Sequence, residues 1–167
     1  EMEADKPGWC DSMNGLPGLC GSSTPEVFEL KRHVVFILDS LKKLNIDDCY
    51  DVNLPEEVRD FIKNLENIIK EKGDDFYYWD KSNSLKEEYR YKIKFGFSGI
   101  ERTLSAGELK EAMNNFLLKI DSAIKKAYDP GKKAYTTYLI NEVVKYELSG
   151  KLDPIKELPL VKPTAFK

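Results

Sequence analysis

The sequence predicts a mainly all-α fold in which antiparallel helices pack together, with a short extended segment near the C-terminus. Four stretches carry apolar residues at the three- and four-residue spacing of a helix with one buried face. Each of these stretches is bounded by residues that favour helix starts or stops. The stretch from Ala134 to Leu148 is instead rich in β-branched and aromatic residues, which favours extended structure.

The first helix is expected over residues 25–44. Ser23 and Glu26 have the spacing of a capping box, and Pro25 suits the first helical turn. The positive end of this helix faces the glycine-rich segment before it, which favours nearby anions or sugar oxygens. Its buried face is predicted to contain Val27, Leu30, Val34, Ile37, Leu38, Leu41 and Leu44.

The second helix is expected over residues 55–72, after a loop at 45–53. Its apolar residues form one continuous stripe, and Gly73 is a good C-terminal stop. The acidic residues of its first turns suit the helix dipole and need no catalytic explanation.

The third helix is expected over residues 75–95, and it is rich in aromatic residues. Tyr78 and Trp79 are possible stacking surfaces for sugar rings, although aromatic residues at helical spacing more often belong to a core. Gly96 and Gly99 predict the exit turn.

The fourth helix is expected over residues 106–128. Ser105 and Glu108 form a second capping box at its start. Asp129-Pro130-Gly131 predicts where it ends.

The composition is typical of a globular protein and excludes some functional classes. The 167 residues are 41% hydrophobic and 33% charged, and the net charge of −3 gives no electrostatic case for nucleic acid or an anionic membrane. No apolar run approaches the ~20 residues that span a bilayer. Cys10, Cys20 and Cys49 are an odd number without metal-ligand spacing, so we expect reduced thiols, a cytoplasmic protein and no metal site.

The stretch from Lys6 to Ser23 organises the rest of the chain. It alternates glycine and proline with the apolar residues Trp9, Met13, Leu16 and Leu19. This composition favours an ordered loop that carries function. An ordered N-terminal arm that only packs has the same composition, so composition alone leaves both readings open.

Within this stretch, Trp9-Cys10-Asp11-Ser12-Met13-Asn14 resembles the Trp-Asn-Asp-Gly-Met-Asn motif of the cellobiose and chitobiose phosphorylases. The following Gly15-Leu-Pro-Gly-Leu-Cys-Gly-Ser-Ser23 and its helix resemble a large, less well described group of glycoside phosphorylase-like proteins. The match departs at Cys10, where Asn is usual, and at Gly8, where an Asp often precedes the Trp. These two departures bear on which substrate is bound, and they bear less on the role of Asp11.

The resemblance implies an (α/α)6 barrel of the six-hairpin glycosidase-like type, which cleaves a β-glycosidic bond by phosphorolysis with inversion. It implies that Asp11 is the general acid. Inorganic phosphate would be the co-substrate, and no cofactor is implied. The residues implied in substrate binding are Trp9, Asn14, Gly15, Ser22 and Ser23.

Such a barrel needs a longer chain than this one. We therefore expect a C-terminal piece of a larger polypeptide, whose partners are an oligosaccharide and the remainder of the parent catalytic domain. The pieces are an active-site-type loop at 1–24, a helical part of the barrel at 25–133, and an extended and irregular segment at 134–167. Together they form one partial domain, and the isolated chain is expected to lack robust activity.

Two alternatives remain open. An inverting glycoside hydrolase would need a second carboxylate roughly 6.5–9.5 Å from Asp11, to act as general base on a water. A phosphorylase does without that base, because phosphate is itself the nucleophile. The other alternative is a non-catalytic helical module that binds a partner through its aromatic surface.

Overall fold

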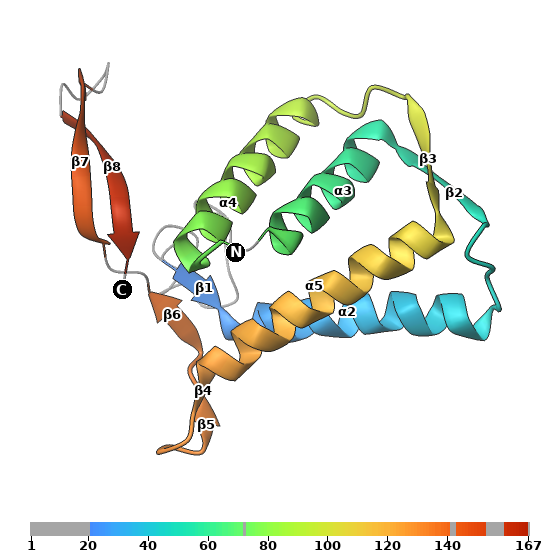
Figure 1. Cartoon of the computed structure of the whole chain (residues 1–167), viewed down its shortest axis with the longest axis horizontal. Coiled ribbons are helices and arrows are strands. Elements are labelled where there is room, and N and C mark those ends of the chain that lie inside the picture. The colour runs from blue at the N-terminus through green and yellow to red at the C-terminus, as the bar shows by residue number, and fades with distance from the viewer. Residues whose placement is uncertain (1–20, 72, 141–142, 153–158, 167) are drawn as a thin grey trace. The chain divides into compact units, whose positions relative to one another are not determined.

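The computed structural model of the chain describes residues 21–71, 73–140, 143–152 and 159–166, which divide between two compact units. One unit is Val27–Lys126. The other joins the two ends of the chain, where the described residues lie within 21–26 and 127–166. Figure 1 labels the helices and strands in chain order.

The helices predicted from the apolar stripes are confirmed within the described residues, with ends no more than three residues from those expected. Residues that flank the third helix have the geometry of a helix start and an exit turn. Asp74 accepts a hydrogen bond from the backbone N–H of Tyr77 at 2.8 Å and so caps its helix. Gly96 and Gly99 follow that helix with φ values of 114° and 80°. The helices are α2 (Thr24–Lys43), α3 (Glu56–Lys70), α4 (Asp75–Lys92) and α5 (Ala106–Ala127).

The all-α prediction is corrected to a mixed fold, because short antiparallel strand pairs accompany the helices. In Val27–Lys126, β2 (Asp51–Pro55) pairs with β3 (Glu101–Ser105). The loop expected at 45–53 therefore ends in a strand, and Leu54 and Pro55 belong to β2 rather than to a helix. Asp, Asn and Pro are poor strand formers, so this pairing depends on tertiary contacts that local propensity does not report.

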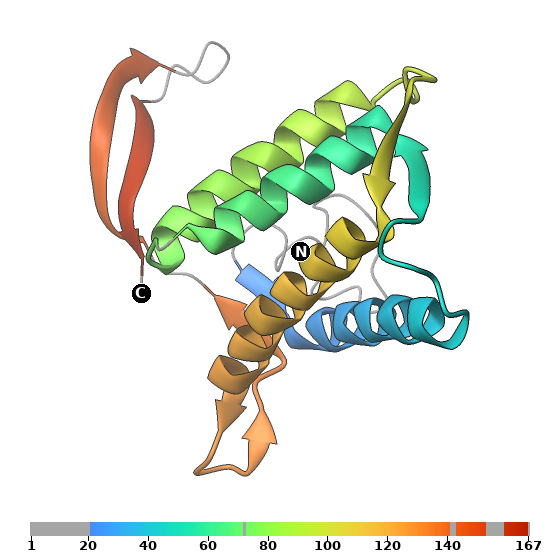
Figure 2. The same cartoon turned by 45° about the vertical axis from the view of Figure 1, so that its right-hand side comes forward.

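Helices α3 and α4 form an antiparallel hairpin. Figures 1 and 2 show them side by side along their length. The rings of Phe61 on α3 and Tyr89 on α4 lie 4.8 Å apart between centroids. None of the described residues of α4 is buried, so α4 lies on the surface of α3 and contributes little to a core.

The apolar core of Val27–Lys126 lies between α2 and α5. Val34 from α2 and Met113 and Ile120 from α5 are its buried residues. Half-buried side chains from the same two helices surround them: Val27, Leu38, Leu109, Phe116, Leu117 and Ile124. The stripe predicted for the first helix is thus confirmed as a packing face at Val27, Val34 and Leu38, but the prediction of burial is wrong for Leu30, Ile37 and Leu44, which are exposed.

The other unit consists of two-stranded antiparallel pairs in its described part. β1 (Gly21–Ser23) pairs with β6 (Tyr138–Ile140), β4 (Tyr128–Asp129) with β5 (Ala134–Tyr135), and β7 (Val143–Leu152) with β8 (Pro159–Phe166). Extended structure after residue 134 is confirmed.

The expected irregular tail is wrong for 159–166, which form β8. Both strands of a two-stranded pair are edge strands, and an edge strand tolerates proline where the missing N–H would face away from the partner strand. Asp129 also ends α5 as predicted, since its Oδ1 accepts from the N–H groups of Gly131 and Lys132.

Leu104 of β3 has the largest fully buried side chain among the described residues, at 1% exposure. We expect Leu104→Ala to lower the free energy of unfolding by about 2–5 kcal/mol, because it leaves a cavity. Leu118→Ala, at a side chain that is 69% exposed on α5, is the matched control. Urea unfolding followed by helical circular dichroism measures both. Equal stability losses in the two variants would contradict the placement of Leu104.

Candidate functional site

Most of the residues expected to form the active site lie outside the described residues. Trp9, Asp11, Asn14 and Gly15 are among them. Ser22 and Ser23 lie in β1, directly before α2. Ser23 is 4% exposed, and its neighbour Thr24 is 5% exposed.

The start of α2 contains a carboxylate that sequence reasoning treated only as part of a cap. Glu26 lies in the first turn of α2, and its Oε2 atom is buried. No donor in the described part of the chain reaches that oxygen. The positive end of the helix dipole favours an acidic group at this position. Glu26 therefore places an acceptor without a partner among the described residues at the start of α2.

A second group of polar and charged residues lies along one face of α5. The five residues concerned are spaced three, four, four and seven apart, so they share one helix face: Glu108, Glu111, Asn115, Lys119 and Lys126. The opposite face of α5 carries the core residues Met113 and Ile120. We call this set of five residues, with their partners on α3 and α4, the polar seam.

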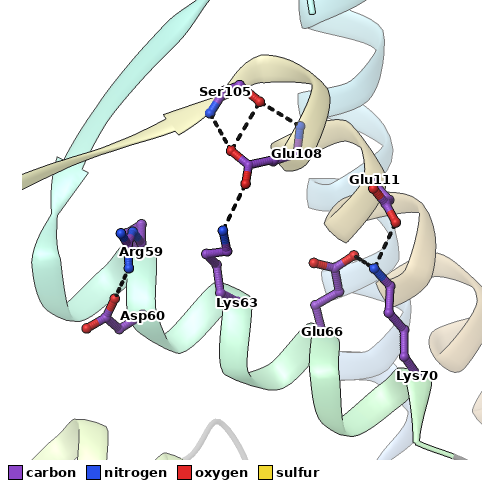
Figure 3. Close-up of polar contacts among 8 residues, drawn as sticks. All are labelled: Arg59, Asp60, Lys63, Glu66, Lys70, Ser105, Glu108 and Glu111. Atoms are coloured by element: carbon purple, nitrogen blue, oxygen red, sulfur yellow. Dashed lines mark hydrogen bonds and ion pairs between the residues drawn. The ribbon is translucent and has the colours of Figure 1, made fainter.

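On the α3 side, the polar seam consists of ion pairs and hydrogen bonds that cross between the two helices (Figure 3). Lys63 Nζ lies 2.8 Å from Glu108 Oε1, and Lys70 Nζ lies 2.8 Å from Glu111 Oε1. Lys70 also pairs with Glu66 of its own helix at 2.8 Å. The seam therefore joins α3 to α5 at two successive points.

A hydrogen bond adds to these ion pairs. Asn115 donates from Nδ2 to Glu66 Oε1 at 2.9 Å, and Glu66 is the one buried residue of α3. A buried carboxylate needs partners of this kind, because desolvation penalises its charge. Glu66 is therefore held from both helices.

On the α4 side, the polar seam continues through Asp75 and Tyr78. Lys126 pairs with Asp75, and Lys119 lies 3.6 Å from the same carboxylate. Lys119 also lies over the ring of Tyr78, with its Nζ 3.9 Å from the centroid. These contacts lower the pKa of Asp75, chiefly through the hydrogen bond from Lys126. Tyr78 thus holds a cation, while Trp79 stacks on Phe76 at 6.2 Å.

Glu108 has two structural roles. Its backbone N–H donates to Ser105 Oγ at 3.1 Å, and its Oε2 accepts from the backbone N–H of Ser105 at 3.0 Å. This is the predicted capping box, and it is confirmed. The hydrogen bond from Lys63, followed by those from Ser105, lowers the pKa of Glu108 to about 2.

The polar seam encloses a cleft of about 200 Å³ between α3 and α5. Its polar lining is made mainly by Lys63, Glu66, Lys70, Glu108 and Glu111, and its floor includes Leu104 and Ala112. Hydrogen bonds to Glu111 and Glu66 raise the pKa of Lys70, whereas the pKa of Glu108 is low. General acid–base catalysis is most effective when the pKa lies near the working pH. These two groups therefore hold charge rather than exchange protons near neutrality.

Two further features of the described residues bear on function. They contain no group of three or more histidine, cysteine or acidic side chains arranged to hold a metal ion. None of the helices in the described part of the chain is long and apolar enough to cross a lipid bilayer.

No protein-family model matches the chain, and no curated protein is similar to it in sequence.

The low pKa of Glu108 makes part of the stability depend on pH. The Glu108 carboxyl binds its proton less tightly in the folded chain than in the unfolded chain. The stabilisation that its ionised form gives the fold is therefore complete above about pH 4.3 and is lost as the pH falls towards 2. Glu108→Gln keeps a capping-box side chain but removes the charge. Because Glu108 is 48% exposed, we expect a loss of only about 0.5–1 kcal/mol near neutral pH and almost none near pH ~2.

Urea unfolding at both pH values measures this loss. Glu101→Gln, which changes an exposed acidic residue of β3, is the control and should have little effect at either pH. A loss in Glu108→Gln that is the same at the two pH values would show that the charge of Glu108 does not stabilise the fold.

Proposed function

We propose that the chain is part of a carbohydrate-active enzyme that cleaves a β-glycosidic bond in an oligosaccharide by phosphorolysis with inversion. The observation that carries the proposal is the segment Trp9-Cys-Asp-Ser-Met-Asn14, followed by a glycine-rich stretch that leads into a helix. The start of α2 at Thr24, directly after Ser22 and Ser23, supports the second half of that pattern.

In this proposal Asp11 is the general acid. Glycosidic cleavage develops positive charge at the sugar ring, and the leaving oxygen needs a proton. Trp9 and Met13 are apolar neighbours of Asp11 in the sequence, and an apolar environment raises the pKa of a carboxyl group so that it keeps its proton. A phosphate oxygen attacks the anomeric carbon from the opposite face, the glycosidic bond breaks, and the proton of Asp11 moves to the leaving oxygen.

The residues that precede α2 in the sequence have the chemistry of a sugar site. Trp9 provides a ring for packing against the pyranose, and Asn14 provides hydrogen bonds. Gly15, Ser22 and Ser23 border the path of the substrate. To these we add Glu26, because a sugar hydroxyl would supply the donor that its buried Oε2 lacks among the described residues.

Exposed apolar residues on α2 support a larger parent domain as the partner of this chain. Leu30 and Ile37 are seven residues apart on α2, so they lie along one edge of the helix, and Leu44 follows directly after its end. These side chains are 52%, 38% and 70% exposed. A stripe of this kind is typical of a helix that packs against another helix. We infer that the helices here form part of an (α/α)6 barrel in the cytoplasm, and that the chain alone lacks robust activity.

The same stripe favours a second candidate, a non-catalytic helical module that binds a partner protein. An inverting hydrolase is a third, distinguished from a phosphorylase by its use of water. The products formed from β-linked oligosaccharides separate these candidates. A phosphorylase releases sugar phosphate, a hydrolase releases only free sugar, and a non-catalytic module releases neither.

Asp11→Asn in the complete parent enzyme tests the catalytic proposal. This change removes the transferable proton and keeps the shape of the side chain. We expect turnover to fall by ~10²–10⁴-fold with the thermal midpoint nearly unchanged, because general acid catalysis typically contributes that much. Sugar phosphate release from β-linked glucan oligosaccharides with inorganic phosphate measures turnover.

Asp39→Asn, at an exposed aspartate of α2, is the matched control and should retain normal turnover. If Asp11 only caps a turn, Asp11→Asn will instead lower stability by about 1 kcal/mol with near-normal turnover in the folded protein. That result would exclude Asp11 as the general acid.

A further inference from the structure

The α3–α4 hairpin is attached to the rest of Val27–Lys126 in two physically different ways. The backbone connection is the β2–β3 pair, which runs from Asp51↔Ser105 to Pro55↔Glu101. The side-chain connection is the polar seam on α5 (Figure 3). The first connection is a hydrogen-bonded ribbon at one end of the hairpin, whereas the second runs along its length.

The end of the β2–β3 ribbon that lies away from the hairpin is fixed to the start of α5. The backbone N–H of Ala106 donates to the carbonyl of Tyr50 at 2.8 Å, and that of Gly107 donates to the carbonyl of Asp48 at 2.9 Å. Lys110 adds an ion pair with Asp48 at 2.6 Å and a hydrogen bond to the carbonyl of Ile46 at 2.7 Å. These contacts make the ribbon and α5 one body.

At the near end of the ribbon, the start of α3 bonds to β3 and to the residues before it: Ser98 N–H donates to Glu57 Oε1 at 2.8 Å and Arg102 Nε donates to Glu56 Oε2 at 2.7 Å. The backbone connections on either side of these bonds are short. Gly96 and Gly99, in the connection from α4 to β3, have positive φ values, and no atom lies within 4 Å of where a Cβ would stand. On the other strand, Pro55 ends β2 and α3 begins at the next residue. Hinges are short segments of this kind, at the ends of elements, that absorb changes in backbone angle.

The two attachments respond differently to salt. The charged side chains of the seam are partly exposed: Lys63 by 41%, Lys70 by 46% and Glu111 by 63%. Exposed ion pairs are individually weak, and salt screens them, since the Debye length falls from ~10 Å at 0.1 M to ~3 Å at 1 M. The apolar packing of Val34 against Met113 and Ile120 has no such dependence.

We propose that the α3–α4 hairpin is a salt-sensitive latch, which swings away from α5 about the near end of the β2–β3 ribbon while the α2–α5 core stays intact. Closed, the hairpin covers the cleft and its floor at Leu104 and Ala112. Open, it exposes that floor to solvent. High ionic strength, or loss of a seam charge, shifts the population towards the open form.

Adjacent residues of α5 provide a matched pair of probes. Ala112 is 1% exposed and lies on the floor of the cleft, whereas Met113 is 6% exposed and lies in the core with α2. Ala112→Cys and Met113→Cys are each made in a chain whose native cysteines are replaced by serine. The rate of thiol labelling then reports separately on opening of the hairpin and on opening of the core.

We expect labelling in Ala112→Cys to accelerate about tenfold between ~20 mM and ~1 M NaCl, because several exposed ion pairs are screened together. Labelling in Met113→Cys should change by less than about twofold. Added to Ala112→Cys, Lys70→Gln should accelerate labelling at low salt. Lys31→Gln should not, although it also breaks an ion pair to α5, with Asp121 at 2.7 Å.

Equal salt responses at the two positions would show that the whole unit opens together and would overturn the proposal, as would no response in Ala112→Cys. If either cysteine variant loses its helical circular dichroism, spin labels on Ser84→Cys in α4 and Lys125→Cys in α5 replace the labelling assay. Their distance distribution should gain a longer component at ~1 M NaCl. A distribution unchanged by salt would contradict the latch.

Discussion

The packing of α5 against α2 is the contact on which the arrangement of Val27–Lys126 depends. Val34, Met113 and Ile120 are buried there, whereas the described residues of α4 contribute no buried side chain. Because α5 presents its apolar face to α2, its opposite face is left to the α3–α4 hairpin, and that face carries charge. Helix α5 is therefore held to α2 by apolar packing, whereas it is held to the α3–α4 hairpin by ion pairs that salt screens.

Glu108 connects the secondary structure of α5 to this tertiary arrangement. Its carboxylate fixes the first turn of α5 by bonding to Ser105, and the same carboxylate accepts from Lys63 of α3. The end of β3, the start of α5 and the middle of α3 thus share one acceptor group. Leu104 of β3 is buried, and the next residue, Ser105, caps α5. Because the two residues are adjacent, the burial of Leu104 and the cap at Ser105 each restrict the backbone of the other.

Sequence patterns predicted the helices well because the helical signals are local. The stripe around Val34, the capping box at Ser105 and the stop at Asp129 are each complete within a few residues. The β2–β3 pairing was missed because it joins residues about 50 positions apart, and Asp51, Asn53 and Pro55 have low strand propensity. The shared polar face of Glu108, Glu111, Asn115, Lys119 and Lys126 was not predicted, and the partners of these residues are set by tertiary packing. For Asp11 the sequence remains the sole guide, since it lies outside the described residues.

The proposed catalytic segment and the polar seam use charge in opposite ways. A general acid must keep a proton near neutral pH, which requires an apolar environment and few cationic neighbours. In the polar seam, by contrast, the hydrogen bond from Lys63 lowers the pKa of Glu108 to about 2. Glu108 therefore stays ionised near neutral pH and stabilises the fold. The pairing of its carboxylates with lysines therefore makes the seam unsuitable for acid catalysis. Trp9 and Met13 flank Asp11 in the sequence and are the kind of neighbours that acid catalysis needs, which is why we propose Asp11, rather than a carboxylate of the seam, as the general acid.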